Sequence, residues 1–173
     1  MIKYIFDIVL LIIVYIVFFY KRWVKKEKKN SVALHLMYIY ICGVLCITLM
    51  PFAIPIPGIL GTNHLFLESI NWIPFKDVME QNGNAILEVI LNIIMFIPFG
   101  FGTTQMKKWN LLRATATAFL FSLGIELTQL LYVWAGNQTS RSCDVTDLLT
   151  NVFGAFLGYL LYIFCSKLHI NRP

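Results

Sequence analysis

Five long apolar runs constrain this chain more than any other feature. They cover residues 4–20, 32–52, 85–104, 114–135 and 145–166. About 20 helical residues cross the hydrocarbon core of a membrane, and helix is expected because lipid offers backbone polar groups no partner. The runs therefore predict an all-α polytopic membrane helix bundle with five transmembrane helices.

The composition agrees with a membrane protein. Of the 173 residues, 58% are hydrophobic and 13% are charged, whereas a soluble domain carries about 25% charged residues. The net charge of +5 does not indicate nucleic-acid binding, because the basic residues lie in short segments beside the apolar runs. We therefore expect a single membrane domain over residues 1–173 and no nucleic-acid partner.

The positions of the basic residues predict the orientation. Eleven of the 14 Lys and Arg residues follow the first run, follow the third run or lie in the C-terminal tail. Basic residues concentrate on the cytoplasmic side of a membrane. The N-terminus is therefore expected outside and the C-terminus inside, with the loops at 54–84 and 136–144 facing outside.

Polar side chains interrupt the last two apolar runs. Glu126 and Gln129 lie within the fourth run, and Asp147 and Asn151 lie near the start of the fifth. Residues three or four apart share a helix face, so each pair forms one polar stripe. A charged side chain at the bilayer centre costs at least about 2.5 kcal/mol and is treated as a functional-site hypothesis.

Further polar residues extend these stripes. Glu88 and Asn92 lie in the third run, and the outer loop before the fifth run carries Arg141 and Asp144. Trp72 lies in an aromatic, Pro-rich stretch of the long outer loop, and Trp prefers the membrane interface. Together they predict a polar pocket open to the outside. The expected catalytic groups are Glu126, Asp144 and Asp147, and the expected substrate-binding groups are Arg141, Gln129, Asn92, Asn151 and Trp72.

Other interpretations of the same polar residues remain open. Clustered carboxylates suit acid–base chemistry, and they equally suit a divalent cation with oxygen ligands. The sequence names neither a metal nor a cofactor. Asn92, Gln129 and Asn151 also fit interhelical hydrogen bonding alone, and a pair between Arg141 and an aspartate also fits a structural loop contact.

Two features outside the polar stripes carry structural predictions. Gly154 and Gly158 follow the small-residue spacing that lets membrane helices pack closely. Asp7, near the outer end of the first run, is expected to reach water.

Four motifs follow one another between about residues 70 and 160. They are Asn71-x-Ile-Pro-Phe, Asn92-Ile-Ile-Met-Phe-Ile-Pro-Phe-Gly, Ser122-Leu-Gly-Ile-Glu-Leu-Thr-Gln and the stretch from Arg141 to Gly158. This ordered set resembles the VanZ-like family of bacterial membrane proteins. The family pattern falls here on Asn92, Glu126, Gln129, Arg141, Asp144, Asp147 and Asn151.

The resemblance implies a multi-pass protein of the bacterial plasma membrane. It also implies an association with glycopeptide resistance, chiefly to teicoplanin, that does not require a changed peptidoglycan stem peptide. It implies no particular reaction. Resistance could also be a by-product of another function in the cell envelope.

Two classes of function fit the chain. One is an enzyme that acts on an envelope lipid or a lipid-linked glycan through the acidic pocket. The other is a non-catalytic protein that binds or shields a lipophilic antibiotic or an envelope component, for which Trp72 would matter more than Glu126. A transporter fits less well because the chain shows no internal repeat. Membrane lipids, a lipid-linked precursor or a lipoglycopeptide are the expected partners, and the sequence does not decide the oligomeric state.

Overall fold

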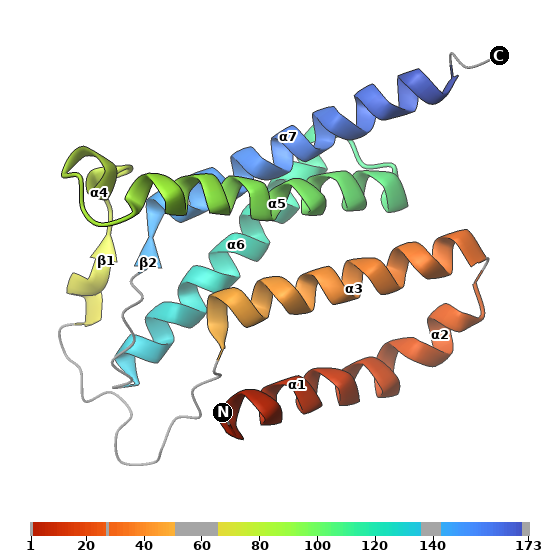
Figure 1. Ribbon diagram of the computed structural model, residues 1–173, viewed down its shortest axis with the longest axis horizontal. Coiled ribbons are helices and arrows are strands. Elements are labelled where there is room, and N and C mark those ends of the chain that lie inside the picture. The colour runs from red at the N-terminus through yellow and green to blue at the C-terminus, as the bar shows by residue number, and fades with distance from the viewer. Residues whose placement is uncertain (1, 27, 51–65, 136–142, 171–173) are drawn as a thin grey trace. The chain divides into compact units, whose positions relative to one another are not determined.

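The computed structural model describes residues 2–26, 28–50, 66–135 and 143–170. This part of the chain is mostly helical and forms two compact units, Met1–Ile56 and Pro57–Pro173 (Figure 1). Four of its helices are long and apolar enough to cross a membrane, and they correspond to the last four predicted runs. These spans are Asn30–Leu49, Ala85–Lys107, Leu111–Trp134 and Val145–Leu168.

The first unit is a helical hairpin. Its elements are α1 (Ile2–Val14), η1 (Tyr15–Tyr20), α2 (Lys21–Val24) and α3 (Lys28–Leu49). The Tyr38 hydroxyl donates to the carbonyl of Leu11 at 2.7 Å, which joins α3 to α1. With 13 residues, α1 alone is about 20 Å long and is shorter than the membrane core. The fifth transmembrane helix and the orientation therefore stay predictions.

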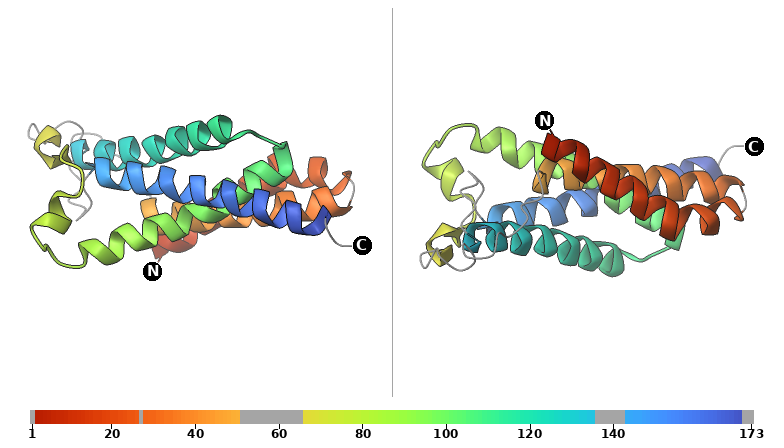
Figure 2. Two further views of the ribbon diagram at one scale, coloured as in Figure 1. Left: turned by 90° about the horizontal axis from the view of Figure 1, so that it is seen from above. Right: turned by 90° about the horizontal axis from the view of Figure 1, so that it is seen from below.

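The second unit contains the remaining elements. They are η2 (Phe66–Ser69), β1 (Ile70–Asn71), α4 (Lys76–Met79), α5 (Ala85–Lys107), α6 (Leu111–Trp134), β2 (Cys143–Asp144) and α7 (Val145–Ile170). Within this unit α7 lies between α5 and α6 (Figure 2), and its most extensive contact is with α5.

Local signals set the ends of these helices. Lys108 ends α5 in a left-handed conformation with φ of 52°. Asn110 then caps α6, because its side chain accepts from the backbone N–H of Arg113 at 3.0 Å and satisfies one of the first-turn donors. The short connection between these residues turns the chain sharply and joins the end of α5 to the start of α6.

Glycines bring α5 and α7 into backbone contact. A Cβ at Gly154 would fall on the Ile93 carbonyl oxygen, and one at Gly158 would fall on that of Ile97. Gly100 of α5 meets the carbonyl of Ala155 in the same way. The predicted close packing at Gly154 and Gly158 is confirmed.

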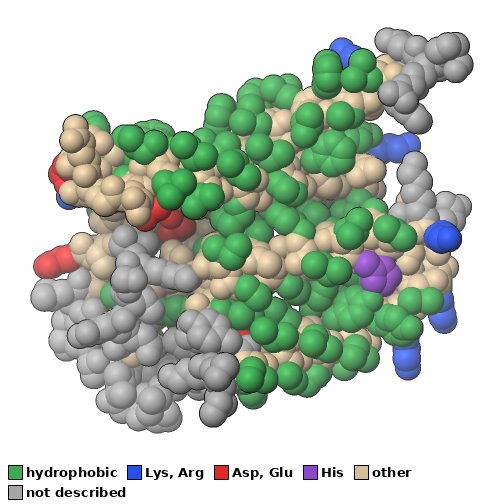
Figure 3. All heavy atoms as spheres, in the orientation of Figure 1, with side chains coloured by type: hydrophobic (Ala, Val, Ile, Leu, Met, Phe, Trp, Pro, Cys, Tyr) green, Lys and Arg blue, Asp and Glu red, His purple; other side chains and the backbone are tan. Residues whose placement is uncertain are grey.

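The outward surfaces of the long helices are apolar. Hydrophobic side chains cover α5 and α7, whereas acidic side chains gather around α4 and the adjoining end of α5 (Figure 3). On α5 the exposed residues include Ile86, Leu87, Ile90, Leu91 and Ile94. Such a surface suits lipid rather than water.

Candidate functional site

A short strand pair brings the segment before α4 to the start of α7. In β1 and β2, Ile70 pairs with Cys143 and Asn71 with Asp144, in parallel register. The backbone N–H of Phe75 donates to the Thr146 hydroxyl at 2.9 Å. These contacts hold the segment before α4 against the first turn of α7.

Asp144 precedes α7 and caps it. Its Oδ1 accepts from the backbone N–H of Thr146 at 2.6 Å, and its Oδ2 accepts from Asn71 Nδ2 at 2.9 Å. The first-turn N–H groups of a helix favour a carboxylate at this position. Asp144 therefore connects three segments of the unit.

Glu126 lies inside the bundle. Only 3% of its surface is exposed, and its Oε2 accepts from the backbone N–H of Asp144 at 2.9 Å. Trp134 ends α6 eight residues later, about 12 Å further along the helix. The start of α7 is thus level with a point well inside α6, which explains how a helix interior meets a helix terminus.

Asp147 connects the site to α5. Its Oδ1 accepts from Asn92 Nδ2 at 2.7 Å. Asp147 is half-buried and lies in the first turn of α7. Because the amide donates to the carboxylate, Asn92 orients Asp147 and stabilises its charge.

Asp144 and Asp147 face a small hollow. Its volume is about 20 Å³, enough for a water molecule but far too small for a lipid head group. It is lined by Phe75, Asp77, Val78, Ala85, Glu88, Val89, Asp144, Thr146 and Asp147. In Figure 3 acidic side chains mark this end of the unit.

A second polar contact lies deeper between α6 and α7. Asn151 Nδ2 donates to Ser122 Oγ at 2.9 Å, and both residues are buried. Asn151 Oδ1 is buried without a hydrogen-bond partner among the residues that the structure describes. This contact agrees with the interhelical interpretation of Asn151.

Glu126, Asp144 and Asp147 form the acidic cluster of this unit. The Cys143 thiol borders this cluster, because it hydrogen-bonds to Glu126. Burial, followed by the charges of Glu126 and Asp144, raises the pKa of Cys143 to about 11. The sulfur is therefore a neutral thiol at neutral pH and a poor nucleophile.

The structure brings four of the eight predicted site residues together. Around the start of α7 it gathers Glu126, Asp144, Asp147 and Asn92. Gln129 is buried one turn from Glu126 on α6. Trp72 follows β1 and is 69% exposed, outside the lining of the hollow. Arg141 lies outside the described residues.

The structure also adds residues that sequence reasoning missed. Ser122 lies four residues before Glu126, so helical spacing alone placed it on the same face. Asn71 stands in the first of the four motifs, and Thr146 is in the first turn of α7. The expectation for Asp7 was wrong: it is 3% exposed, because this position of α1 faces protein atoms instead of water.

The described chain contains no ready-made transition-metal site. Within residues 2–26, 28–50, 66–135 and 143–170, no group of three His, Cys, Asp or Glu side chains is arranged to hold a metal ion. The contacts of the aspartates are instead amide and backbone N–H groups.

Comparison with known proteins gives the chain its relatives. The model of the VanZ/LLP1 family matches residues 37–166. The chain is 34% identical over 116 residues to Protein VanZ of Enterococcus faecium, a match that covers 66% of this chain and 65% of that protein. It therefore spans slightly less than two thirds of that relative, and no solved structure matches it. Since the family model covers most of the sequence, including every residue of the acidic cluster in α6, β2 and α7, this chain belongs to the VanZ-like family.

Proposed function

We propose that this is a plasma-membrane protein of the bacterial cell envelope, associated with teicoplanin resistance, that acts on an envelope lipid or lipid-linked glycan. Its family membership supports the association with resistance. The observation that carries the proposed activity is the convergence of Glu126, Asp144 and Asp147 at the start of α7. Acid–base chemistry needs carboxylates held in fixed positions by hydrogen bonds.

The carboxylates take different roles in this proposal. Asp147 exchanges a proton with the bound molecule, because it lines the hollow and Asn92 fixes its orientation. Asp144 shares the hollow and holds the outer loop. Glu126 is buried and supports Asp144 from α6, and its own proton transfer stays a prediction. Arg141 would bind a phosphate or another anionic group of the substrate.

The test replaces single carboxylates in cells. Asp147→Asn and Glu126→Gln keep the side-chain shape but remove the charge, and both should abolish teicoplanin resistance while membrane levels of the protein hold. Glu80→Gln, in the exposed turn after α4, is the matched control and should keep resistance. Full resistance in Asp147→Asn would contradict the proposed proton transfer. An unchanged teicoplanin susceptibility with the wild-type chain would contradict the association with resistance.

A non-catalytic binder is the second candidate, and one observation favours it. The hollow is too small for a lipid head group, while Trp72, Ile73 and Met79 beside it present exposed apolar surface. A lipophilic ligand would rest on these side chains instead of entering the hollow.

The two candidates make opposite predictions. For the binder, Trp72→Ala combined with Ile73→Ala and Met79→Ala abolishes resistance, whereas Asp147→Asn has no effect. Leu112→Ala, at an equally exposed apolar residue of α6, is the control. Mass spectrometry of envelope lipids completes the test, because only the enzyme changes their composition.

A further inference from the structure

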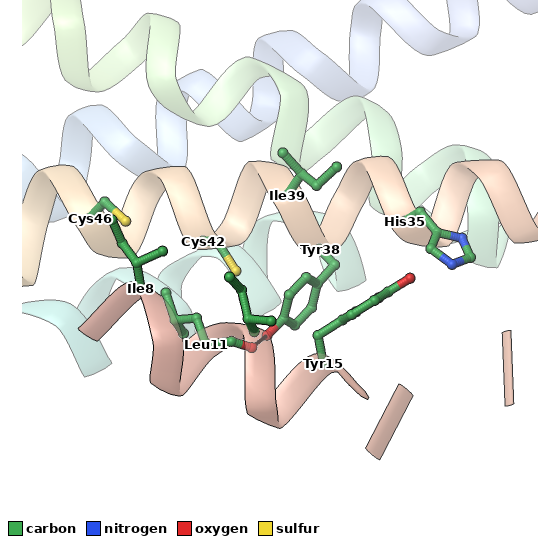
Figure 4. Close-up of a pocket in the computed structure, with 9 residues that line it drawn as sticks. Ile8, Leu11, Tyr15, His35, Tyr38, Ile39, Cys42 and Cys46 are labelled. Atoms are coloured by element: carbon green, nitrogen blue, oxygen red, sulfur yellow. Dashed lines mark hydrogen bonds between the residues drawn. The ribbon is translucent and has the colours of Figure 1, made fainter. Parts of the chain in front are cut away.

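The first unit contains an apolar groove that is separate from the acidic cluster. It lies between α1 and α3 and has a volume of about 350 Å³ (Figure 4). Its lining is Ile8, Leu11, Ile12, Tyr15, His35, Tyr38, Ile39, Cys42 and Cys46. Figure 4 shows that Cys42, Cys46 and Tyr38 reach from α3 toward α1.

The size of the groove suits one alkyl chain. At about 350 Å³ the groove is many times larger than the hollow beside Asp147, and its lining is mainly apolar. Ile8 of α1 and Tyr15, the first residue of η1, lie near its two ends and are seven residues apart, hence about 10 Å along the helix. A narrow apolar space of this length accepts part of an acyl chain.

Aromatic rings stand at one end of the groove. The Tyr15 ring centroid lies 5.2 Å from that of Tyr38, and the Trp23 centroid lies 5.6 Å from that of His35. Trp and Tyr prefer the level of the lipid head groups, where an apolar ring meets a polar surrounding. This end therefore fits the junction between an acyl chain and its head group.

Cationic side chains flank Trp23 in the sequence. Lys21 and Arg22 belong to α2, and Lys25, Lys26 and Lys28 come next; all five are exposed. Over residues 21–29 the sequence has six basic residues and one acidic residue. At the opposite end, Asp7 adjoins Ile8 on α1. The charges along the hairpin thus favour a negative group at the aromatic end.

We propose that the groove binds one anionic phospholipid. An acyl chain lies between α1 and α3, and the head-group phosphate contacts Lys21, Arg22 and Lys25. The choice of an anionic lipid rests on the basic residues at the aromatic end, since a neutral lipid would gain nothing from them. This site goes beyond the proposed function and shares no residue with the acidic cluster.

The test measures lipid contact at Trp23 in the full chain. Trp72, Trp109 and Trp134 are replaced by Phe, so that Trp23 is the remaining tryptophan. The protein is placed in phosphatidylcholine nanodiscs with a small fraction of phosphatidylglycerol brominated on its acyl chains, which quench nearby tryptophan. Brominated phosphatidylglycerol should bind roughly fivefold more tightly than brominated phosphatidylcholine, the preference that one basic side chain near an anionic surface provides.

Two sets of variants separate the groove from the charges. Cys42→Phe fills the groove and should remove saturable quenching by either lipid, whereas Gly43→Phe, at an exposed neighbour outside the lining, should leave it intact. Replacing Lys21, Arg22, Lys25 and Lys26 by Gln should abolish the preference for phosphatidylglycerol. Lys107→Gln with Lys108→Gln, at the end of α5, should preserve it.

Native mass spectrometry of the wild-type protein measures bound lipid directly and needs no variant. One phosphatidylglycerol should remain bound to it after transfer from mixed vesicles. Equal quenching of Trp23 by both brominated lipids would overturn the proposal, and so would equal effects of Cys42→Phe and Gly43→Phe. The absence of saturable Trp23 quenching would mean that other parts of the chain fill the groove, which would overturn it too.

Discussion

The helix α7 meets its two neighbours through contacts of opposite kinds. Toward α5, Gly154 and Gly158 place backbone directly against backbone. Toward α6, hydrogen bonds join Asp144 to Glu126 and Asn151 to Ser122. At the two glycines the α5 face has no room for a larger side chain, and its hydrogen bond from Asn92 to Asp147 lies in the first turn of α7. The α6 face depends on particular side chains.

This difference separates what holds the fold from what builds the site. Without a hydrophobic driving force between helices in lipid, close van der Waals packing at small residues carries much of their association. Interhelical hydrogen bonds average only about 0.6 kcal/mol each. We therefore expect the glycine contacts with α5 to dominate stability, and the hydrogen-bonded polar residues around the start of α7 to dominate function.

The largest effect is expected on the glycine face. Gly154→Ala and Gly158→Ala each place a Cβ against a backbone carbonyl, and overpacking of this kind costs about 1–3 kcal/mol. Gly124→Ala is the control, because nothing lies within 4 Å of its Cβ position. This variant should be roughly 0.5–1 kcal/mol more stable than the wild-type protein. Denaturation in mixed micelles measures all three, and a loss no greater at Gly154 than at Gly124 would contradict the contrast.

A smaller effect is expected where Asp144 caps α7. Asp144→Ala removes acceptors for Thr146 and Asn71 and should cost about 1 kcal/mol. Asp144→Asn retains the cap because asparagine is an equally good N-cap residue, so the same unfolding measurement should show near wild-type stability. Equal losses in the two variants would show that charge, instead of capping, determines the contribution of Asp144.

The deeper contact of the α6 face should be weaker still. In a double-mutant cycle of Asn151→Ala and Ser122→Ala, the coupling free energy should be about 0.6 kcal/mol. A coupling above about 2 kcal/mol would exceed the largest interhelical values and would remove the distinction between the two faces.

The last prediction concerns the reactivity of Cys143, whose protonation has the smallest effect on stability at neutral pH. With Cys42, Cys46 and Cys165 replaced by Ala, maleimide labelling at pH 8 should be roughly 200-fold slower in the folded than in the unfolded protein, because an unperturbed thiol has a pKa near 8.5 and that of Cys143 is about 11. The Cys143 thiol stays protonated to a higher pH in the folded state than in the unfolded state. The free energy of unfolding should therefore fall as pH rises from about 8.5 to about 11. Glu126→Gln removes one nearby charge and should speed labelling; slower labelling in that variant would exclude the charge of Glu126 as a cause.

Much of the second unit follows from pattern alone. Apolar length and helical spacing predicted the starts of α5 and α7 and the polar stripes on α6 and α7. The Gly154 and Gly158 spacing predicted a close contact, although only coordinates show that α5 provides it. These features are local, so the sequence carries them directly.

The rest of the site depends on contacts between distant segments. Asn71 reaches Asp144 across 73 residues, and Asn92 reaches Asp147 across 55. No local rule pairs them. The burial of Asp7 was missed for the same reason, since it depends on what surrounds α1.

The contact between Glu126 and Asp144 has a consequence for biosynthesis. When α6 enters the membrane, Glu126 arrives before its hydrogen-bond donor, because the backbone N–H of Asp144 lies 18 residues later in the chain. A chain that stops before β2 would leave this carboxylate unmatched in lipid, which is costly. Arrival of the final helix thus supplies the donor that an incomplete molecule lacks.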